Sequence, residues 1–203
     1  VIDSVNGVEE QTRRLMEVCR MRDTPVIVFI NKMDRDGKLP FDLLEEIEKE
    51  LHLQLHPMTW PINSGKEFKG VYNLFEKNLL LFAPHTKTND EDMEHITDLS
   101  TPLLVDKIGE RNAAQLREDV ELIDGVYGDM NVQDYLLAKT APVFFGSAVN
   151  NFGVKEMLNT FIRIAPGPLC RPTSEKEICP EDEKFSGFIF KIHANLDPRH
   201  RDR

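Results

Sequence analysis

One tetrapeptide, Asn31-Lys32-Met33-Asp34, carries the side chains with the clearest chemical potential in this sequence. It follows an apolar run, Val26 to Ile30, so a buried strand would present it at the carboxyl end of the strand, where open α/β sheets bind ligands. The Asp34 carboxylate only accepts hydrogen bonds, and it can pair with two adjacent N–H donors at once. A guanine edge offers two such donors side by side, and adenine does not.

The other two polar members of the tetrapeptide suit the same task. The aliphatic stem of Lys32 can lie across a base plane while its ammonium reaches solvent or backbone carbonyls. Asn31 can tie neighbouring loops together through its amide. Each hydrogen bond to a charged group is worth about 1.5–3 kcal/mol, and a mismatched base adds a penalty to that difference. These side chains could therefore recognise a base that presents two adjacent donors, such as guanine.

The elements that must position this loop follow an α/β order. Helices are predicted where apolar residues recur three and four positions apart, and buried strands where short apolar runs end at polar residues or glycine. The predicted helices cover residues 8–22, 40–51, 113–126, 132–139 and 154–164, and the predicted buried strands cover 26–30 and 141–145. The predicted helix 8–22 should bury Leu15 and Val18. The predicted helix 154–164 should bury Met157, Leu158, Phe161 and Ile162.

The remaining segments have weaker patterns. Residues 58–62 predict an extended segment, and residues 63–82 predict a hairpin around Gly65 and Gly70. The acidic stretch 84–110 predicts an exposed loop with at most short helices. Residues 170–183 predict a linker, and the alternation in 185–193 predicts a half-buried antiparallel strand.

Composition excludes several classes of protein. The 203 residues carry a net charge of -10, so no global positive field would draw the segment to nucleic acid, and we identify no direct nucleic-acid site. No apolar run is long enough to span a membrane. Cys19, Cys170 and Cys179 form no CxxC pair and have no metal-ligand spacing, which predicts free structural thiols in a reducing compartment and no metal site.

The tetrapeptide after a buried strand resembles the guanine-specificity motif of the P-loop GTPases. In those proteins a second loop, with a short Ser-Ala motif after the next buried strand, supplies a backbone N–H to the guanine O6. Ser147-Ala148 occupies that place here, behind the predicted strand 141–145. The resemblance thus adds Ser147 and Ala148 to Asn31, Lys32 and Asp34 as nucleotide-binding residues. The long separation of the two motifs implies an insertion at about residues 63–140.

The phosphate-binding half of such a site is absent from the sequence. No GxxxxGKS or GxxxxGKT phosphate loop occurs, and the two DxxG matches, at 34–37 and 106–109, lack the right context. We therefore predict no catalytic and no metal-binding residue in this chain, and no GTP hydrolysis by it alone. With its start at Val1 in the middle of a strand-like segment, the chain has the character of a fragment.

Several segments together resemble bacterial peptide chain release factor three, a family of translational GTPases. They are Thr24-Pro25, residues 31–36, 59–62, 68–72 and 142–146, and the closing stretch 184–203. The resemblance implies an α/β fold: a partial P-loop-GTPase sheet with flanking helices and an insertion, followed by the first strands of a β-barrel. Residues 1–168 would be the later part of a GTP-binding domain, and residues 169–203 a linker and the start of the barrel.

The same resemblance implies a cytoplasmic protein that acts at translation termination. Its ligands would be GTP and GDP, with Mg²⁺ bound only in the full-length parent, and its partners would be the ribosome and the codon-reading release factors. Two alternatives stay open: a fragment of an elongation-factor-G-like GTPase, which shares a similar NKMDR stretch, and a folding fragment without a usable nucleotide site. Trp60 and the segment 197–203 favour the release factor.

Overall fold

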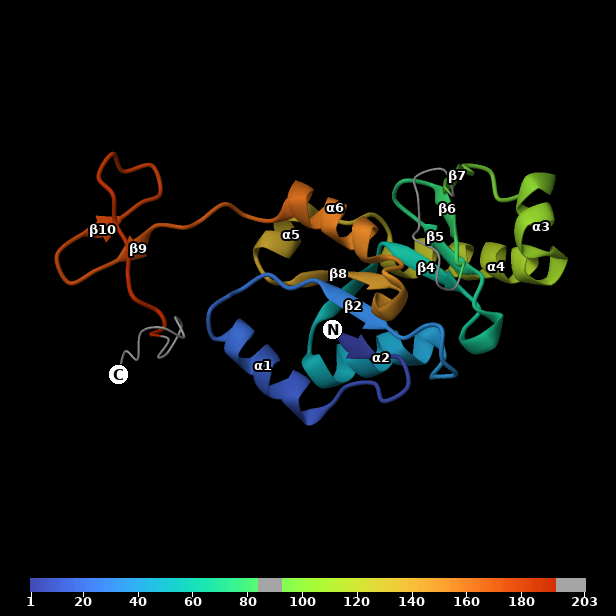
Figure 1. The fold of residues 1–203 in the computed structure, drawn as a ribbon, viewed down its shortest axis with the longest axis horizontal. Helices are drawn as coiled ribbons and strands as arrows, with labels where there is room; N and C mark the ends of the chain where they lie inside the picture. The colour runs from blue at the N-terminus through green and yellow to red at the C-terminus, as the bar shows by residue number, and fades with distance from the viewer. Residues whose placement is uncertain (84–92, 193–203) are drawn as a thin grey trace, which may run out of the picture. The chain divides into compact units, whose positions relative to one another are not determined.

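The computed structural model describes residues 1–83 and 93–192. The chain divides into two compact units, Val1–Ala165 and Pro166–Arg203. The predicted α/β fold class is confirmed, because the first unit contains a parallel sheet flanked by helices and a separate antiparallel sheet (Figure 1).

Four parallel strands form the sheet that positions the predicted tetrapeptide. They are β1 (Ile2–Asp3), β2 (Val28–Asn31), β8 (Thr140–Phe145) and β3 (Gln54–Pro57), in the sheet order β1-β2-β8-β3. The predicted strands 26–30 and 141–145 correspond to β2 and β8 and are confirmed. β3, by contrast, was not predicted, although it pairs with β8 from Gln54 opposite Thr140 to Pro57 opposite Val143.

Helices cover both faces of this sheet. They are α1 (Glu10–Arg20), α2 (Pro40–Leu51), α5 (Val132–Leu136) and α6 (Val154–Ile164), and Figure 1 shows α1 and α2 on one side and α5 and α6 on the other. Because successive strand residues face opposite ways, Ile30 and Phe145 join the large core cluster that includes α2. Phe29 and Phe144 pack on the other face, with partly buried residues of α6.

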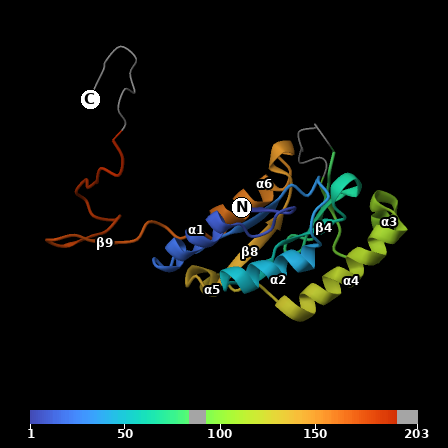
Figure 2. The same cartoon turned by 90° about the horizontal axis from the view of Figure 1, so that it is seen from below.

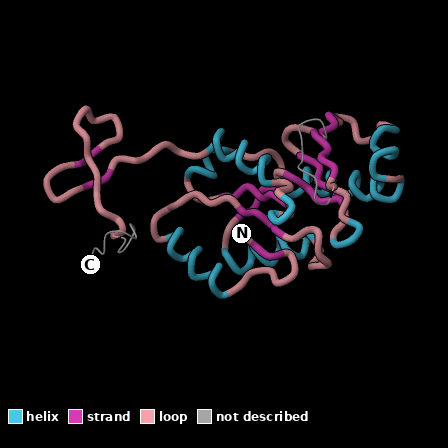
Figure 3. Tube along the Cα trace, viewed as in Figure 1, coloured by secondary structure: helices cyan, strands magenta, loops and turns pink. Residues whose placement is uncertain are grey.

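A second, antiparallel sheet begins just before the predicted insertion and continues within it (Figure 3). Its strands are β4 (Thr59–Ile62), β5 (Gly70–Asn73), β6 (Asn78–Leu81) and β7 (Met93–His95), in that order. Met58 alone separates β3 from β4, and its N–H donates to the carbonyl of Val143 at 2.8 Å. One continuous stretch of chain therefore passes from the parallel sheet into the antiparallel one.

The predicted exposed loop 84–110 is only partly correct. Residues 93–95 form β7, and residues 102–108 form a helix, α3 (Pro102–Ile108), which buries Leu104 and Ile108. Gly109, with φ of 87°, separates α3 from α4 (Glu110–Tyr127), a long helix that contacts β3 and β4 (Figure 2). The acidic run 89–92 lies outside the described residues. The prediction gave weight to the acidic composition of the stretch and overlooked its apolar residues, two of which are buried in α3.

Two helices expose the apolar faces that the sequence predicted to be buried. Leu15 and Val18 of α1 are exposed, and so are Leu158, Phe161 and Ile162 of α6. α1 contacts the core through the partly buried Met16 instead, and Met157 is the one predicted α6 residue that packs inward. An amphipathic pattern shows that a face is apolar, but coverage of that face requires a packing partner.

The second unit corrects two further expectations. Cys170 and Cys179 form a disulfide across a short hairpin of β9 (Arg171–Pro172) and β10 (Glu177–Ile178), so only Cys19 is a free thiol. The predicted strand 185–193 has no regular secondary structure over 185–192, and its exposed Phe residues pack on no core. A strand needs a partner to satisfy its backbone, and the described residues supply none here. The segment 197–203 lies outside the described residues.

Removal of the disulfide is expected to leave the first unit unaffected. The Cys170→Ser, Cys179→Ser double variant should retain the thermal midpoint of the main unfolding transition, because the bridge constrains a short loop entirely within residues 166–203. Circular dichroism with and without reductant measures this. A clear drop in that midpoint would mean that the two units fold cooperatively.

Candidate nucleotide-base site

The two predicted motifs meet at one edge of the parallel sheet. Residues 31–34 leave the carboxyl end of β2, and Gly146-Ser147-Ala148 leave the carboxyl end of β8, its direct neighbour. The Met33 N–H donates to the Gly146 carbonyl at 3.1 Å, and the Ala148 N–H donates to Asn31 Oδ1 at 2.8 Å. Parallel pairing of adjacent strands therefore brings together residues that lie far apart in the sequence.

Asn31 links the two loops through a single oxygen. Its Oδ1 accepts from the N–H of Lys32 at 2.8 Å as well as from Ala148. Ser147, which is fully buried, accepts at its Oγ from Asn150 Nδ2 at 2.8 Å, and its backbone pairs with Phe152 in an antiparallel bridge. The Ser147–Phe152 loop is thus a closed turn with a defined shape, tied to β2 by Asn31.

Lys32 adopts a left-handed backbone, with φ of 70°, and its ammonium forms an ion pair with Asp3 at the end of β1. Burial alone would raise the pKa of the Asp3 carboxyl, but hydrogen bonds from Lys32 and from the amides of Val5 and Asn6 outweigh it and lower that pKa. Ser4 Oγ also donates to the Lys32 carbonyl at 3.0 Å. These contacts attach Lys32, and with it the tetrapeptide loop, to the end of the edge strand β1.

Asp34 differs from Asn31 and Lys32 in its hydrogen bonding. Its Oδ1 atom is buried and has no hydrogen-bond partner in the described part of the chain. The residue lines a cavity of about 460 Å³ whose other walls are Gly65, Lys66, Phe68, Lys69, Phe82, Val149 and Asn150. This volume falls within the range of about 300–1,000 Å³ that is typical of small-ligand sites. An acceptor without a donor at a cavity wall is what a ligand with N–H groups would complete.

The other predicted site residues do not line this cavity. Asn31, Lys32, Ser147 and Ala148 are absent from the lining, and Val149 and Asn150 of the same second loop take their place. The Ala148 N–H already donates to Asn31, so in this conformation it is not free for another acceptor.

Sequence analysis missed the wall that the insertion supplies. The Gly65 N–H donates to the Met33 carbonyl at 2.9 Å, so the loop after β4 is attached directly to the tetrapeptide. A side chain at Gly65 would begin 1.8 Å from Asp36 Oδ1, so a larger residue would have to displace the Asp36 side chain and adopt a strained backbone at φ of 63°. The Gly-Lys-Glu-Phe-Lys-Gly run at 65–70, with its two glycines and two lysines, was the available signal.

An aromatic cluster supports that wall. Phe68, Phe82 and Phe152 are in mutual contact, with ring centroids 5.0–5.6 Å apart in tilted and edge-to-face arrangements. Phe152 belongs to the Ser147–Phe152 turn, so the cluster joins the insertion to the second motif. Lys66 and Lys69 are exposed at the cavity and are the cationic residues of its lining.

Loss of the Asn31 link is expected to cost measurable stability. Asn31→Ala should lower the free energy of unfolding by about 1–2 kcal/mol, because two backbone N–H groups lose their acceptor. Asn31→Asp keeps an acceptor oxygen and should lose less than half as much. Urea denaturation of both variants measures the difference, and equal losses would show that the side-chain oxygen is not what matters.

A parallel α/β sheet with polar loops at the carboxyl ends of its strands is the arrangement that nucleotide-binding α/β proteins share. The family can be stated more narrowly. The model of the elongation factor Tu GTP-binding domain matches residues 1–167, and the chain belongs to this family of translational GTPases. The description of this domain family names GTP as its ligand.

A solved structure shares the fold. The crystal structure of ttk003000868 from Thermus thermophilus aligns with a TM-score of 0.57 and 17% sequence identity, over 82% of this chain and 26% of that one. The chain therefore spans about a quarter of the length of that protein. No helix within the described residues is both long and apolar enough to cross a bilayer.

Proposed function

We propose that this segment recognises the guanine base of GTP and GDP in a translational GTPase. The observation that carries the proposal is the buried, unpartnered Oδ1 of Asp34, a residue that lines the 460 Å³ cavity. Guanine N1–H and its 2-amino group would donate to the two carboxylate oxygens, and adenine would leave them unpaired at a cost of several kcal/mol.

The other predicted residues would act around this contact. Asn31 would hold the Ser147–Ala148 loop against the base site, and the stem of Lys32 would cover one face of the base. The guanine O6 needs a backbone donor from the second loop. In our proposal the Ala148 N–H shifts from Asn31 to O6 when the base binds, which keeps the number of hydrogen bonds unchanged.

The phosphates and Mg²⁺ would be held by parts of the protein other than this segment, because the sequence contains no phosphate loop. We therefore propose that the 203-residue chain alone binds guanine nucleotide weakly and does not hydrolyse it. GTP hydrolysis is proposed for the full-length parent. Submicromolar GDP binding by this chain would contradict the proposal that the phosphates are bound by other parts of the protein.

Two-dimensional NMR titration tests base recognition directly. GDP at millimolar concentration should shift the backbone amide signals of Asp34, Ala148 and Val149, and ADP at the same concentration should not. Shifts at Lys66 and Lys69 alone, equal for both nucleotides, would indicate phosphate attraction without base reading. That result would withdraw the site proposal and leave the family assignment intact.

For the parent we propose a cytoplasmic GTPase of translation termination, with the ribosome and the codon-reading release factors as partners. Its support is the set of segments that resemble peptide chain release factor three, Trp60 and Phe68 to Tyr72 among them. The full-length protein should accelerate, in a GTP-dependent manner, the departure of a codon-reading release factor from ribosomes after peptide release. Acceleration of translocation instead would assign it to the elongation-factor-G-like alternative.

A further inference from the structure

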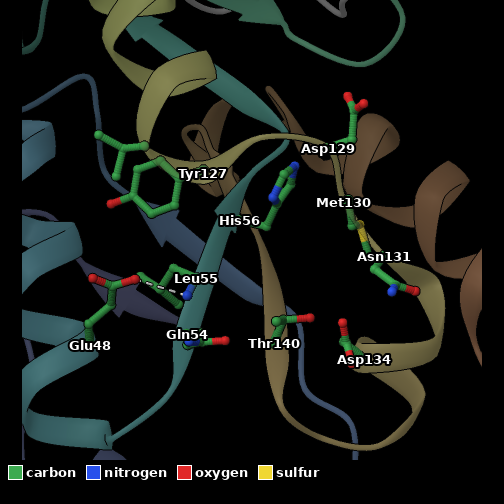
Figure 4. Close-up of a pocket in the computed structure, with 11 residues that line it drawn as sticks. Glu48, Gln54, Leu55, His56, Tyr127, Asp129, Met130, Asn131, Asp134 and Thr140 are labelled. Carbon is green, nitrogen blue, oxygen red and sulfur yellow. Dashed lines mark hydrogen bonds between the residues drawn. The ribbon is translucent and has the colours of Figure 1, made fainter.

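A second cavity lies at the opposite edge of the parallel sheet from Asp34 (Figure 4). It forms where β3 and β8 begin, at the paired residues Gln54 and Thr140, whereas the nucleotide motifs follow the ends of β2 and β8. Its volume is about 340 Å³. Its walls come from α2, β3, the end of α4, the following turn, α5 and the start of β8.

Three carboxylates give this cavity a negative potential: Glu48, Asp129 and Asp134. One oxygen of Glu48 accepts from the Leu55 N–H at 3.0 Å. Asp134 lies 3.6 Å from Lys139, but their side chains are 39% and 62% exposed, so water screens this pair strongly. Burial lowers the pKa of His56 and the nearby charge of Asp129 only partly opposes this, so the imidazole is neutral at pH 7 and adds no positive charge.

Two residues with hydroxyl groups, Tyr127 and Thr140, line the same cavity. Burial, together with the charge of Glu48, raises the pKa of Tyr127 to about 12, so its phenol stays protonated at neutral pH. Thr140 Oγ1 is buried without a hydrogen-bond partner in the described part of the chain. An unsatisfied buried hydroxyl destabilises the folded state, and a bound donor would recover part of this cost.

The positions of these groups select the shape of the ligand. Figure 4 shows Glu48 and Tyr127 on one side of the cavity and Asp129 and Asp134 on the other, with Leu55 and His56 between them. Leu55 and Met130 provide apolar surface along the way. A ligand with a cationic group at each end and methylenes in the middle would match this order of charge and apolar surface.

A single inorganic cation fits less well, because its ligands must converge on one point. Among the described residues, the one set of three His, Cys, Asp or Glu ligand atoms close enough for this is Cys170, Cys179 and Glu181, which lies elsewhere and whose thiols form a disulfide. The carboxylates of the cavity do not converge in this way.

We propose that this cavity is a binding site for a linear aliphatic polyamine. One terminal ammonium would donate to Glu48 and Tyr127, and the other would lie between Asp134, Asp129 and Thr140. The site is separate from the base site and does not rest on the proposed guanine recognition.

Isothermal titration calorimetry of the 203-residue chain with spermidine at low ionic strength tests the proposal. We expect saturable binding at one site, weakened about tenfold by Asp134→Asn and by Asp129→Asn, since each variant removes a charged acceptor. Glu121→Gln, which removes an exposed carboxylate of α4 outside the cavity, should bind as the unchanged protein does.

A variant that is expected to tighten spermidine binding separates a specific effect on the cavity from a loss of folding. Lys139→Gln removes the cation that competes for Asp134 and should tighten spermidine binding severalfold, whereas a merely damaged fold would weaken it. Thr140→Val, of nearly the same shape, should weaken binding by a smaller factor than the carboxylate variants. Circular dichroism confirms that each variant is folded.

Three results would overturn the proposal. They are the absence of saturable binding, equal affinities for the Asp129, Asp134 and Glu121 variants, and equal affinity for butylamine, which has a single ammonium. Equal effects of Glu121→Gln and the cavity variants would mean that spermidine responds only to the net charge of -10. Displacement of spermidine by an equal concentration of MgCl₂ would be a fourth such result, because it would favour an inorganic cation site instead.

Discussion

Asp34→Asn is expected to lower the affinity of the full-length GTPase for GDP by about 100-fold or more. The carboxylate would accept two hydrogen bonds from guanine, and the amide of Asn presents an N–H group to one of these donors. Xanthine carries an oxygen at the position of the guanine 2-amino group, so the variant should gain affinity for XDP as it loses GDP. The sign of the change would therefore differ between the two nucleotides.

Competition against a fluorescent guanine nucleotide measures both changes in one experiment. Asp42→Asn provides the matched control, because Asp42 is an exposed carboxylate in the first turn of α2 and does not line the cavity. Its GDP affinity should stay unchanged. If Asp34→Asn still prefers GDP over XDP, the unpartnered Oδ1 of Asp34 has no part in base recognition.

Phe145→Ala is expected to lower the free energy of unfolding by about 3–5 kcal/mol. The Phe145 ring is fully buried and packs edge-to-face on Trp60, with ring centroids 5.5 Å apart. Trp60 in turn contacts Phe41 and donates through Nε1 to Asp119 Oδ2 at 2.8 Å. The cavity left by the ring would lie between β8, α2 and the antiparallel sheet, where these elements cannot easily close in.

Urea denaturation followed by Trp60 fluorescence measures this loss, because Trp60 is the single tryptophan of the chain. Phe185→Ala makes the same chemical change at a fully exposed position and should alter stability by less than about 0.5 kcal/mol. Phe145→Leu, which keeps most of the volume, should cost about 1 kcal/mol and remain folded. Equal losses for Phe145→Ala and Phe185→Ala would contradict the packing described at Trp60.

The parts of the fold that the sequence predicted well are those with a strong local period. α2 and α6 begin and end where the pattern placed them, at Pro40–Leu51 and Val154–Ile164, and β2 and β8 follow from their apolar runs. β3 was missed because its four residues, Gln54–Pro57, contain His and Pro and resemble a loop. Its place is determined by pairing with β8, a contact between segments that lie far apart in the sequence.

The candidate site divides in the same way. The residue type and position of Asp34, and the prediction of a guanine-reading loop, come from the sequence, because the tetrapeptide 31–34 after a buried strand resembles the guanine-specificity motif of the P-loop GTPases. Three features came only from the tertiary structure: the unpaired Oδ1 atom, the wall formed by Gly65, Lys66 and Lys69, and the link from Asn31 to Ala148. Each depends on which loops lie next to each other at the edge of the sheet.

The sequence by itself determined the local elements, the amphipathic faces and the acceptor chemistry of Asp34, since these depend on residues a few positions apart. The tertiary structure alone decided which apolar faces are covered, which cysteines pair and where the two cavities lie. Those outcomes depend on contacts between distant segments, whose energies are comparable to those of alternative pairings and leave no periodic trace in the chain.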